Sequence, residues 1–177
     1  MSTLAIPETL SVILERKSVR TYTGQPVGEE HIKWILQAAM AAPAAVHKFP
    51  WKFIVIRDSE MLHYLAGGLP FAKMLAEAGT AIVVCVVPQE AFAGKTELAV
   101  IAGACASQNI LLAAEALGLG AVWTALYPDP ELMQFVRTEL DIPDTVIPLN
   151  IIPVGYPSGK DKATAKYDAA NIHWEEW

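Results

Sequence analysis

The stretch LAVIAGACASQNILLAAEALGL, residues 98–119, is the one part of the sequence long and apolar enough to be considered as a membrane span. Four polar residues interrupt it where a membrane span would be penalised, namely Ser107, Gln108, Asn109 and Glu115. We therefore interpret it as a long buried helix of a globular protein. A helix that is apolar on nearly all sides must be covered from several directions. In a chain of this size a second subunit can supply part of that cover, so we expect a homodimer.

The composition indicates one soluble globular domain over residues 1–177. The 177 residues include 19 acidic and 13 basic side chains, for a formal net charge of −6, and 53% of them are hydrophobic. A chain of this length buries roughly 70% of the surface that its unfolded form exposes, which is enough for a complete core. The acidic balance argues against nucleic acid or an anionic membrane surface as the main partner.

The cysteines and the N-terminus carry no signature of a secreted protein. Cys85 and Cys105 lie in apolar runs without paired spacing, so we interpret both as small buried hydrophobic residues rather than as a disulfide or a zinc site. The first eight residues lack a basic segment followed by an apolar segment and a cleavage site. We therefore expect no secretory signal and a cytoplasmic location.

Hydrophobic periodicity predicts helices and four strands in an irregular order. The first helix has Pro7 in its first turn and an apolar stripe on Ile6, Leu10, Ile13 and Leu14, and residues 21–24 end it. Further helices are expected at residues 29–42, 61–65, 71–78, 98–119 and 131–139, and strands at 51–57, 81–87, 121–126 and 146–154. The irregular spacing and the absence of an early strand argue against a doubly wound sheet. We predict an α+β fold.

Basic residues gather in two short segments of this acidic chain. Six of the thirteen are Arg16, Lys17, Arg20, Lys160, Lys162 and Lys166. The first segment places two guanidinium groups, an ammonium group and the hydroxyl of Ser18 near a helix end, a set that can hold a phosphate through charge-assisted hydrogen bonds. Alternatively, the same basic residues complement the dipole of the preceding helix.

The loop at residues 42–51 combines small residues with a rigid Pro50-Trp51 pair. Small side chains let a flat ligand approach the backbone closely. The alternative is that Pro and Ala only end the helix, and that His47 is a surface or hydrogen-bonded histidine. From residue 157 onward the tail has no apolar period, yet it ends in IHWEEW, residues 172–177. Because each tryptophan can bury a large area, we expect this tail to dock on a surface, with the partner subunit as a candidate.

Common catalytic motifs are missing from the sequence. It contains no Gly-x-Ser-x-Gly, no His-Glu-x-x-His, no phosphate-binding P-loop and no paired-cysteine motif, and its four scattered histidines predict no metal site. Gly118-Leu119-Gly120 follows a helix and precedes a strand, the reverse of a dinucleotide-binding loop, so helix capping explains it better. Any chemistry is therefore expected to come from a bound cofactor.

Four motifs together resemble the flavin-dependent nitroreductase family, and their order and spacing match it over nearly the whole chain. They are RKSVR at 16–20, APAAxxxxPWxFxV at 42–55, ALGLGAVW at 116–123 and IPVGYP at 152–157. The resemblance implies a small single-domain member with a three-layer α/β/α sandwich around a central, mostly antiparallel sheet. It also implies an intertwined homodimer that exchanges its C-terminal tails, residues 158–177, and binds FMN at the interface.

The resemblance also implies the cofactor-binding residues. Arg16, Lys17 and Ser18 would hold the phosphate and ribityl chain, and Arg20 would lie near the flavin N1/O2 edge, where a positive charge stabilises the reduced flavin. Pro43, Ala44, Ala45 and His47 would come from the other subunit and line the isoalloxazine. Trp123, Thr124 and Ala125 would approach N5 through backbone groups, and Lys166 would be the one tail cation. Ala44, His47 and Phe49 stand where the family commonly has Ser, Asn and Gln.

The implied activity is hydride transfer from NADH or NADPH to FMN, followed by reduction of a flat electrophilic acceptor such as a nitroaromatic or a quinone in a ping-pong cycle. The flavin carries the chemistry, so no side chain is predicted to be catalytic. Two alternatives remain open at this point. One is an FMN-binding storage or sensor protein without turnover, and the other is a dimeric interaction protein that has lost flavin.

Overall fold

The computed structural model describes residues 7–159 and 161–177 of the chain. Ile6 of the first predicted stripe, Lys160 of the tail and the first six residues considered for a secretory signal lie outside the described residues. The α-helices are α1 (Glu8–Glu15), α2 (Glu29–Met40), α3 (Ser59–Gly68), α4 (Leu75–Ala78), α5 (Thr96–Ala116) and α6 (Pro130–Glu139). The strands are β1 (Trp51–Ile56), β2 (Thr80–Val86), β3 (Gly120–Ala121), β4 (Thr124–Ala125) and β5 (Ile147–Gly155). Short 3-10 helices are η1 (Ala45–His47), η2 (Pro88–Glu90), η3 (Phe92–Gly94) and η4 (Ala169–Asn171).

A five-stranded sheet forms the centre of the fold, and its strands run in the order β1-β2-β5-β3, with β4 also paired to β5. All of these strand pairs are antiparallel. Every residue of β2 is buried, and so is β5 after its first residue. Such continuous burial requires helices on both faces of the sheet, and it explains why both strands read as unbroken apolar runs.

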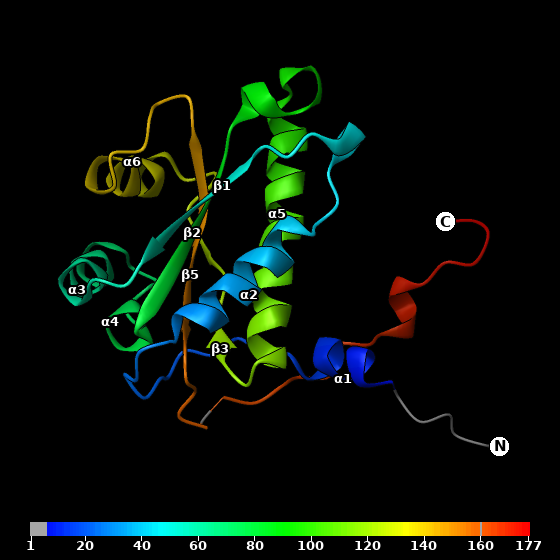
Figure 1. Cartoon of the computed structure of the whole chain (residues 1–177). Coiled ribbons are helices and arrows are strands. Elements are labelled where there is room, and N and C mark those ends of the chain that lie inside the picture. The colour runs from blue at the N-terminus through cyan, green and yellow to red at the C-terminus, as the bar shows by residue number, and fades with distance from the viewer. Residues whose placement is uncertain (1–6, 160) are drawn as a thin grey trace.

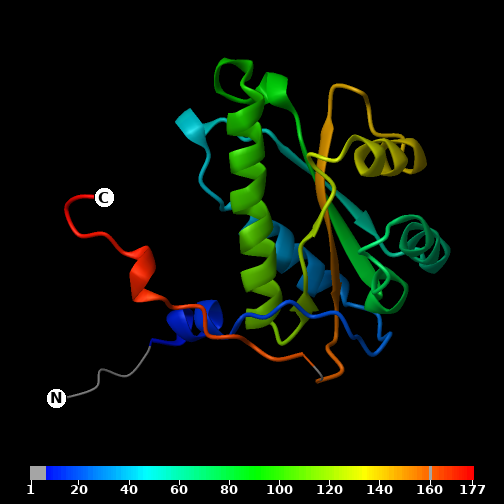
Figure 2. The same ribbon diagram turned by 180° about the vertical axis from the view of Figure 1, so that it is seen from behind.

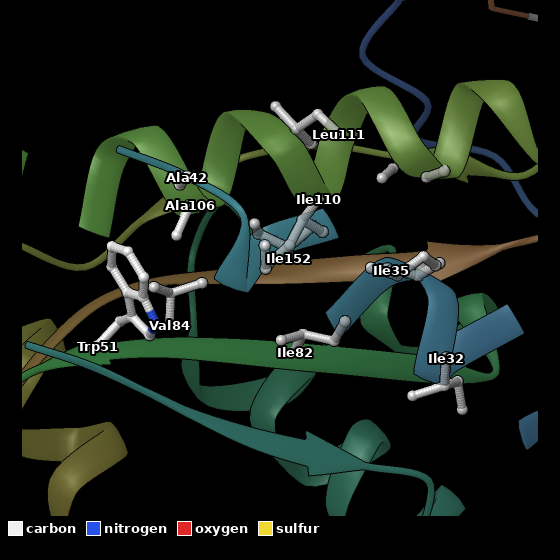
Figure 3. Close-up of a cluster of buried hydrophobic side chains, with 14 of the residues drawn as sticks. Ile32, Ile35, Ala42, Trp51, Ile82, Val84, Ala106, Ile110, Leu111 and Ile152 are labelled. Carbon is white, nitrogen blue, oxygen red and sulfur yellow. The ribbon is translucent and has the colours of Figure 1, made fainter. Parts of the chain in front are cut away.

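Helices cover the sheet on both sides, which confirms the predicted α+β fold with three layers. Helices α2 and α5 lie on one face, and α3, α4 and α6 lie on the other (Figures 1 and 2). Under α2 and α5, isoleucine and alanine side chains from both helices meet side chains of β2 and β5 (Figure 3). A separate buried cluster fills the opposite face, with members such as Leu65, Leu75 and Val136.

Helix α5 is the long buried helix predicted from residues 98–119. By length and composition alone it could cross a membrane, but 44% of its most apolar window is buried inside the protein, where it packs on the sheet and on α2. One polar pair lies beneath it. The Asn150 side-chain amide of β5 donates a hydrogen bond of 2.8 Å to the Ser107 hydroxyl, which donates to the Gly103 carbonyl. Among the described residues the Asn150 side-chain oxygen has no hydrogen-bond partner.

The segment after the first helix becomes extended earlier in the chain than the sequence predicted. The first helix ends at Glu15 rather than at residues 21–24, and Ser18 forms a parallel bridge to Ala121 while Tyr22 forms an antiparallel bridge to Pro157. This prediction was wrong because the segment finds its backbone partners more than 100 residues away. Likewise, only residues 75–78 of the helix expected at 71–78 are α-helical. The residues before them form turns that begin at Pro70.

The strand predicted at residues 121–126 is divided into β3 and β4. Both pair with β5 in one register, Ala121 with Val154 and Thr124 with Ile151, so Pro153 lies opposite Val122. Proline has no backbone N–H to donate, which interrupts the ladder at this point. The sheet therefore has five strands where four were predicted.

The tail after β5 first follows the body of the protein and then leaves it. Near its start, the backbone N–H of Ser158 donates to the Thr21 carbonyl, and the Thr21 hydroxyl donates to the Asp161 carboxylate over 2.8 Å. Beyond this point the tail passes α1 and projects from the domain (Figures 1 and 2). Trp174 and Trp177 are almost fully exposed in the single chain, so the described part of the domain does not cover them and their docking stays a prediction.

The two cysteines differ in environment. Cys85 is buried as predicted, whereas Cys105 is only partly buried on α5, so the interpretation of both as core residues was half right. Burial raises the pKa of the Cys85 thiol from 9.0 to about 12, and the positive charge of Arg137 opposes this rise in part.

Candidate functional site

The basic segment at residues 16–20 runs extended beside β3 and is joined to it by a single parallel bridge between Ser18 and Ala121. The backbone N–H of Val19 donates a hydrogen bond of 3.1 Å to the Ala121 carbonyl. The Val19 side chain is buried against Gly120, where a Cβ atom would lie only 2.5 Å from it. A residue larger than glycine at position 120 would therefore push the segment away from β3. Gly118 has φ +70°, as expected of a glycine that ends α5.

Residues 16–20 alternate between two sides because the segment is extended. Val19 and Lys17 face the protein: Val19 enters the core, and the Lys17 ammonium lies 2.8 Å from the Glu115 carboxylate at the end of α5. Arg16, Ser18 and Arg20 occupy the alternate positions. The sequence pattern Arg-x-Ser-x-Arg thus places two guanidinium groups and a hydroxyl on one side, which is a better phosphate-binding arrangement than the helix end predicted from sequence.

Tyr22 fixes the end of this segment. Its hydroxyl is buried and donates to the Val19 carbonyl over 2.7 Å. Burial, together with the negative charge of Asp161, raises the pKa of the Tyr22 phenol above its usual range. Tyr22 therefore stays neutral and serves as a structural anchor.

A cavity of about 550 Å³ lies beside the segment, and it joins residues that are about 100 positions apart in the sequence. It is lined by Arg20, Val122, Trp123, Thr124 and Ala125, and by Pro70, Phe71, Lys73 and Met74 from the turn before α4. Among the described residues, its charged side chains are Arg20 and Lys73, and none that lines it is acidic. Its size is typical of a small-molecule site. Its chemistry suits a flat, largely apolar ligand with a negative charge.

The interruption between β3 and β4 contributes residues to the wall of this cavity. Val122 and Trp123 stand between β3 and β4, opposite the part of β5 that contains Pro153. The division of one predicted strand into two therefore occurs at the cavity.

The loop after α2 lies elsewhere on the surface of the same chain. Pro43, Ala44 and Ala45 line a smaller cavity of about 190 Å³ with residues of α5, including Ile101 and Cys105. Val46 and His47 both have positive φ values, 53° and 54°. This is costly for the β-branched Val46, so the loop is held in a strained conformation.

His47 is exposed and packs edge-on against Phe49, with ring centroids 6.4 Å apart. Phe49 in turn lies 5.3 Å from the Trp51 ring at the start of β1. The loop thus presents a short row of aromatic rings that leads from the surface to the core.

Comparison with known proteins identifies the fold family. A model of the nitroreductase family matches this chain in two overlapping parts, residues 13–95 and 66–156.

The chain belongs to the nitroreductase family.

Alignments with the following three relatives cover nearly the full chain. It is 41% identical over 176 residues to a protein of Methanothermobacter thermautotrophicus provisionally named NADH dehydrogenase/NAD(P)H nitroreductase, with 96% of this chain and 88% of the relative covered. A crystal structure of a protein of the same provisional name from Parabacteroides distasonis has 46% identity and a TM-score of 0.91, covering 97% of this chain and 100% of that one. A protein provisionally named nitroreductase from Desulfovibrio desulfuricans, crystallised in complex with FMN, has 28% identity and a TM-score of 0.83, covering 97% and 98%.

Within this nitroreductase chain, the predicted site residues fall into three groups. Arg20, Trp123, Thr124 and Ala125 line one cavity, and Arg16, Lys17 and Ser18 lie along the segment that leads to it. Pro43, Ala44 and Ala45 line a different cavity, with His47 nearby. Lys166 is exposed in the projecting tail. A single chain therefore keeps these three groups apart from one another.

Sequence reasoning missed the turn at residues 70–74 as part of the site. Lys73 and Phe71 carry no motif, and the periodicity of this stretch favoured a helix. The one available signal was Pro70 after Gly67-Gly68, which marks a break in helical structure where a binding wall can form.

A third hollow lies away from this site, between α1, α2 and α5. It has a volume of about 410 Å³ and is lined mainly by apolar residues, among them Val12, Ile13, Leu112 and Ala113. Helix α1 also leaves Leu10 and Leu14 exposed. We refer to this apolar hollow as the α1 groove.

Proposed function

We propose that this protein is an FMN-dependent NAD(P)H oxidoreductase that reduces flat electrophilic acceptors such as nitroaromatics or quinones. The observation that carries the proposal is the cavity in which Arg20 and Lys73 meet the segment from Val122 to Ala125, with no acidic side chain among the described residues of its wall. The names of the relatives and the FMN complex of the protein from Desulfovibrio desulfuricans support the same conclusion.

The residues present fit FMN in size and in charge. The cavity of about 550 Å³ is within the range of small-molecule sites, and its apolar side chains suit a flat aromatic ring system. Arg16 and Ser18 are on the same side of the extended segment as Arg20, so a ligand with a ring at Arg20 and a phosphate further along would meet donors at both ends. When bound, FMN supplies a carrier that takes hydride from the nicotinamide and returns electrons to the second substrate.

The chain's own residues then have distinct tasks. Arg16 and Ser18 hold the phosphate and ribityl chain. In place of the phosphate contact that the resemblance implies for Lys17, its ammonium pairs with Glu115 and keeps the segment in place. Arg20 and Lys73 stabilise negative charge that develops on the reduced ring system, because both cations lie on the wall of the cavity that would hold the ring. The backbone of residues 123–125 orients the ring.

The remaining predicted residues act across a homodimer in this proposal. Pro43, Ala44, Ala45 and His47 line the ring from the partner subunit, and Lys166 of an exchanged tail adds a cation near the phosphate. The exposed side chains of Trp174, Trp177, Ile101 and Leu14 and the α1 groove support a second copy as the missing cover, because monomers rarely expose so many large apolar side chains.

The absorbance spectrum of the purified protein, before and after anaerobic NADH or NADPH, tests the proposal. We expect a yellow protein whose flavin band is bleached by a nicotinamide and restored by a quinone. A yellow protein that neither nicotinamide bleaches would instead indicate an FMN-binding protein without turnover. A colourless protein that cannot be reconstituted with FMN would indicate a dimeric interaction protein.

Replacement of Arg16 tests the phosphate assignment. Arg16→Ala removes a charge-assisted hydrogen-bond partner worth about 1.5–3 kcal/mol, so FMN affinity should fall roughly tenfold to a hundredfold. Arg57→Ala is the matched control, because Arg57 lines a different hollow near α3 and has no expected contact with FMN. Equal FMN affinities of the two variants in a fluorescence titration would remove Arg16 from the site.

A further inference from the structure

Phe71 is the most exposed side chain among the large apolar residues of the cavity wall, with 77% of its surface accessible. It is part of none of the buried clusters formed by the described residues. A phenylalanine left in water forgoes the burial that stabilises others in the core. Its position on the wall of a ligand cavity indicates a contact surface for a ligand.

The neighbouring residues force Phe71 to point outward. Leu69 and Ala72 on either side are buried, with exposed fractions of 1% and 0%. The Ala72 N–H donates to the Leu69 carbonyl over 3.3 Å, and the Leu75 N–H donates to the Ala72 carbonyl over 3.0 Å. The Lys73 ammonium donates to the Gly67 carbonyl over 3.2 Å. The backbone of the turn is therefore held from both ends, so little backbone entropy is lost when a ligand binds beside it.

We propose that Phe71 is the residue that selects flat aromatic acceptors, by packing its ring against the acceptor in the cavity. This inference rests on the proposed function. Aromatic rings gain from offset or edge-to-face contact in addition to the area they bury, so the contact favours acceptors with a ring over acceptors without one. Phe71 takes no part in electron transfer, and its effect lies in acceptor binding.

The test compares Phe71→Ala with wild-type holoprotein, using naphthoquinone as a flat acceptor and ferricyanide as an acceptor without a ring. Naphthol, which has the flat ring but is not reduced, serves as a binding probe through its perturbation of the flavin absorbance. Phe71→Ala should raise the KM for naphthoquinone and the Kd for naphthol about tenfold. With FMN saturating, ferricyanide reduction by the variant should change far less than naphthoquinone reduction, and the FMN affinity of the variant is measured in parallel. Phe71→Tyr should restore both lost affinities.

Phe92→Ala is the matched control, since Phe92 is another exposed phenylalanine, on η3, that does not line the cavity. Unchanged naphthol affinity in Phe71→Ala, or the same loss in Phe92→Ala, would overturn the proposal. A drop in FMN affinity with naphthol affinity of the holoprotein intact would also overturn it, because Phe71 would then support the cofactor. A wild-type protein that binds no FMN would refute the proposed function itself, and this inference with it.

Discussion

The Lys17 ammonium lies 2.8 Å from the Glu115 carboxylate, although the two residues are 98 positions apart in the chain. Their side chains are 27% and 16% exposed, so the pair is partly shielded from solvent. It joins the basic segment to the C-terminal end of α5, the helix that also leads into β3. The pair therefore fixes the segment that carries Arg16, Ser18 and Arg20 relative to the cavity.

Removal of this pair should cost stability. Glu115→Gln leaves the Lys17 charge partly buried without its partner, and we expect a loss of about 1–2 kcal/mol in the free energy of unfolding, measured by urea denaturation. The matched control is Glu29→Gln, which breaks the Lys33–Glu29 pair of α2. That pair is 67% and 70% exposed, so its loss should be barely measurable. Equal effects of the two substitutions would show that the Lys17–Glu115 pair behaves as an ordinary surface pair.

Gly120→Ala should displace the basic segment. The new methyl group would lie 2.5 Å from the Val19 side chain, and overpacking of this kind costs about 1–3 kcal/mol. FMN affinity should fall with stability, and Val19→Ala in the same protein should restore part of both. Gly118→Ala is the comparison: it strains a residue with φ +70° but meets no neighbour within 4 Å, so stability should fall with little change in FMN affinity. Retained FMN affinity in Gly120→Ala would contradict the link between this packing and the site.

Deletion of residues 163–177 should reduce both the size of the particle and the retention of flavin. The deletion keeps Asp161, which accepts the Thr21 hydrogen bond, but it removes Lys166 and the two exposed tryptophans of the tail, Trp174 and Trp177. Analytical ultracentrifugation measures the particle, and the absorbance spectrum measures the flavin. The double substitution Trp174→Ser, Trp177→Ser separates the role of the rings from that of the backbone. A truncated protein with the size and colour of the wild type would show that the tail does not hold the assembly together.

Stability should decrease above about pH 9. The folded protein keeps Cys85 protonated up to a pKa of about 12, whereas the unfolded chain releases that proton above 9.0. The unfolded state then binds fewer protons than the folded state, so the free energy of unfolding falls by about 1.4 kcal/mol per pH unit between these values. The raised pKa of Tyr22 adds to the loss at higher pH. Cys85→Ala should remove the part of the decrease that begins near pH 9, and urea denaturation at several pH values measures it. A pH profile identical to that of the wild type would mean that the thiol is not the cause.

Elements with strong local patterns were predicted from the sequence. We could predict β2, β5 and α5 because each is a long apolar run in the sequence. Elements that are buried on several sides have few polar residues. The α+β class followed from their order. Boundaries that depend on distant partners were not predictable: Arg16 to Arg20 became an extended edge because Ala121 offers backbone partners, and the strand after α5 broke because Pro153 lies opposite.

The site was predictable only where a motif marked it. Arg20 and Trp123 to Ala125, which the motifs predicted to contact FMN, line one cavity, and their contact with FMN stays a prediction. Lys73 and Phe71 were missed because a turn has no periodicity, and their exposure depends on the buried neighbours Leu69 and Ala72. The loop from Pro43 to His47 lines a different hollow in the single chain, so its proposed role depends on a second subunit.

The hydrogen bond between Ser107 and Asn150 has a consequence for how α5 is seated. A helix of Ala, Leu, Ile and Gly could turn about its own axis and still cover the sheet with apolar surface, since its buried side chains are similar in kind. The observed rotation gives the buried Asn150 amide the Ser107 hydroxyl as its acceptor, and a rotation that left this donor unpaired would cost about 1–3 kcal/mol. The polar pair thus helps to set the rotation of α5 about its axis. That rotation leaves side chains such as Cys105 and Ile101 toward the outside of the protein.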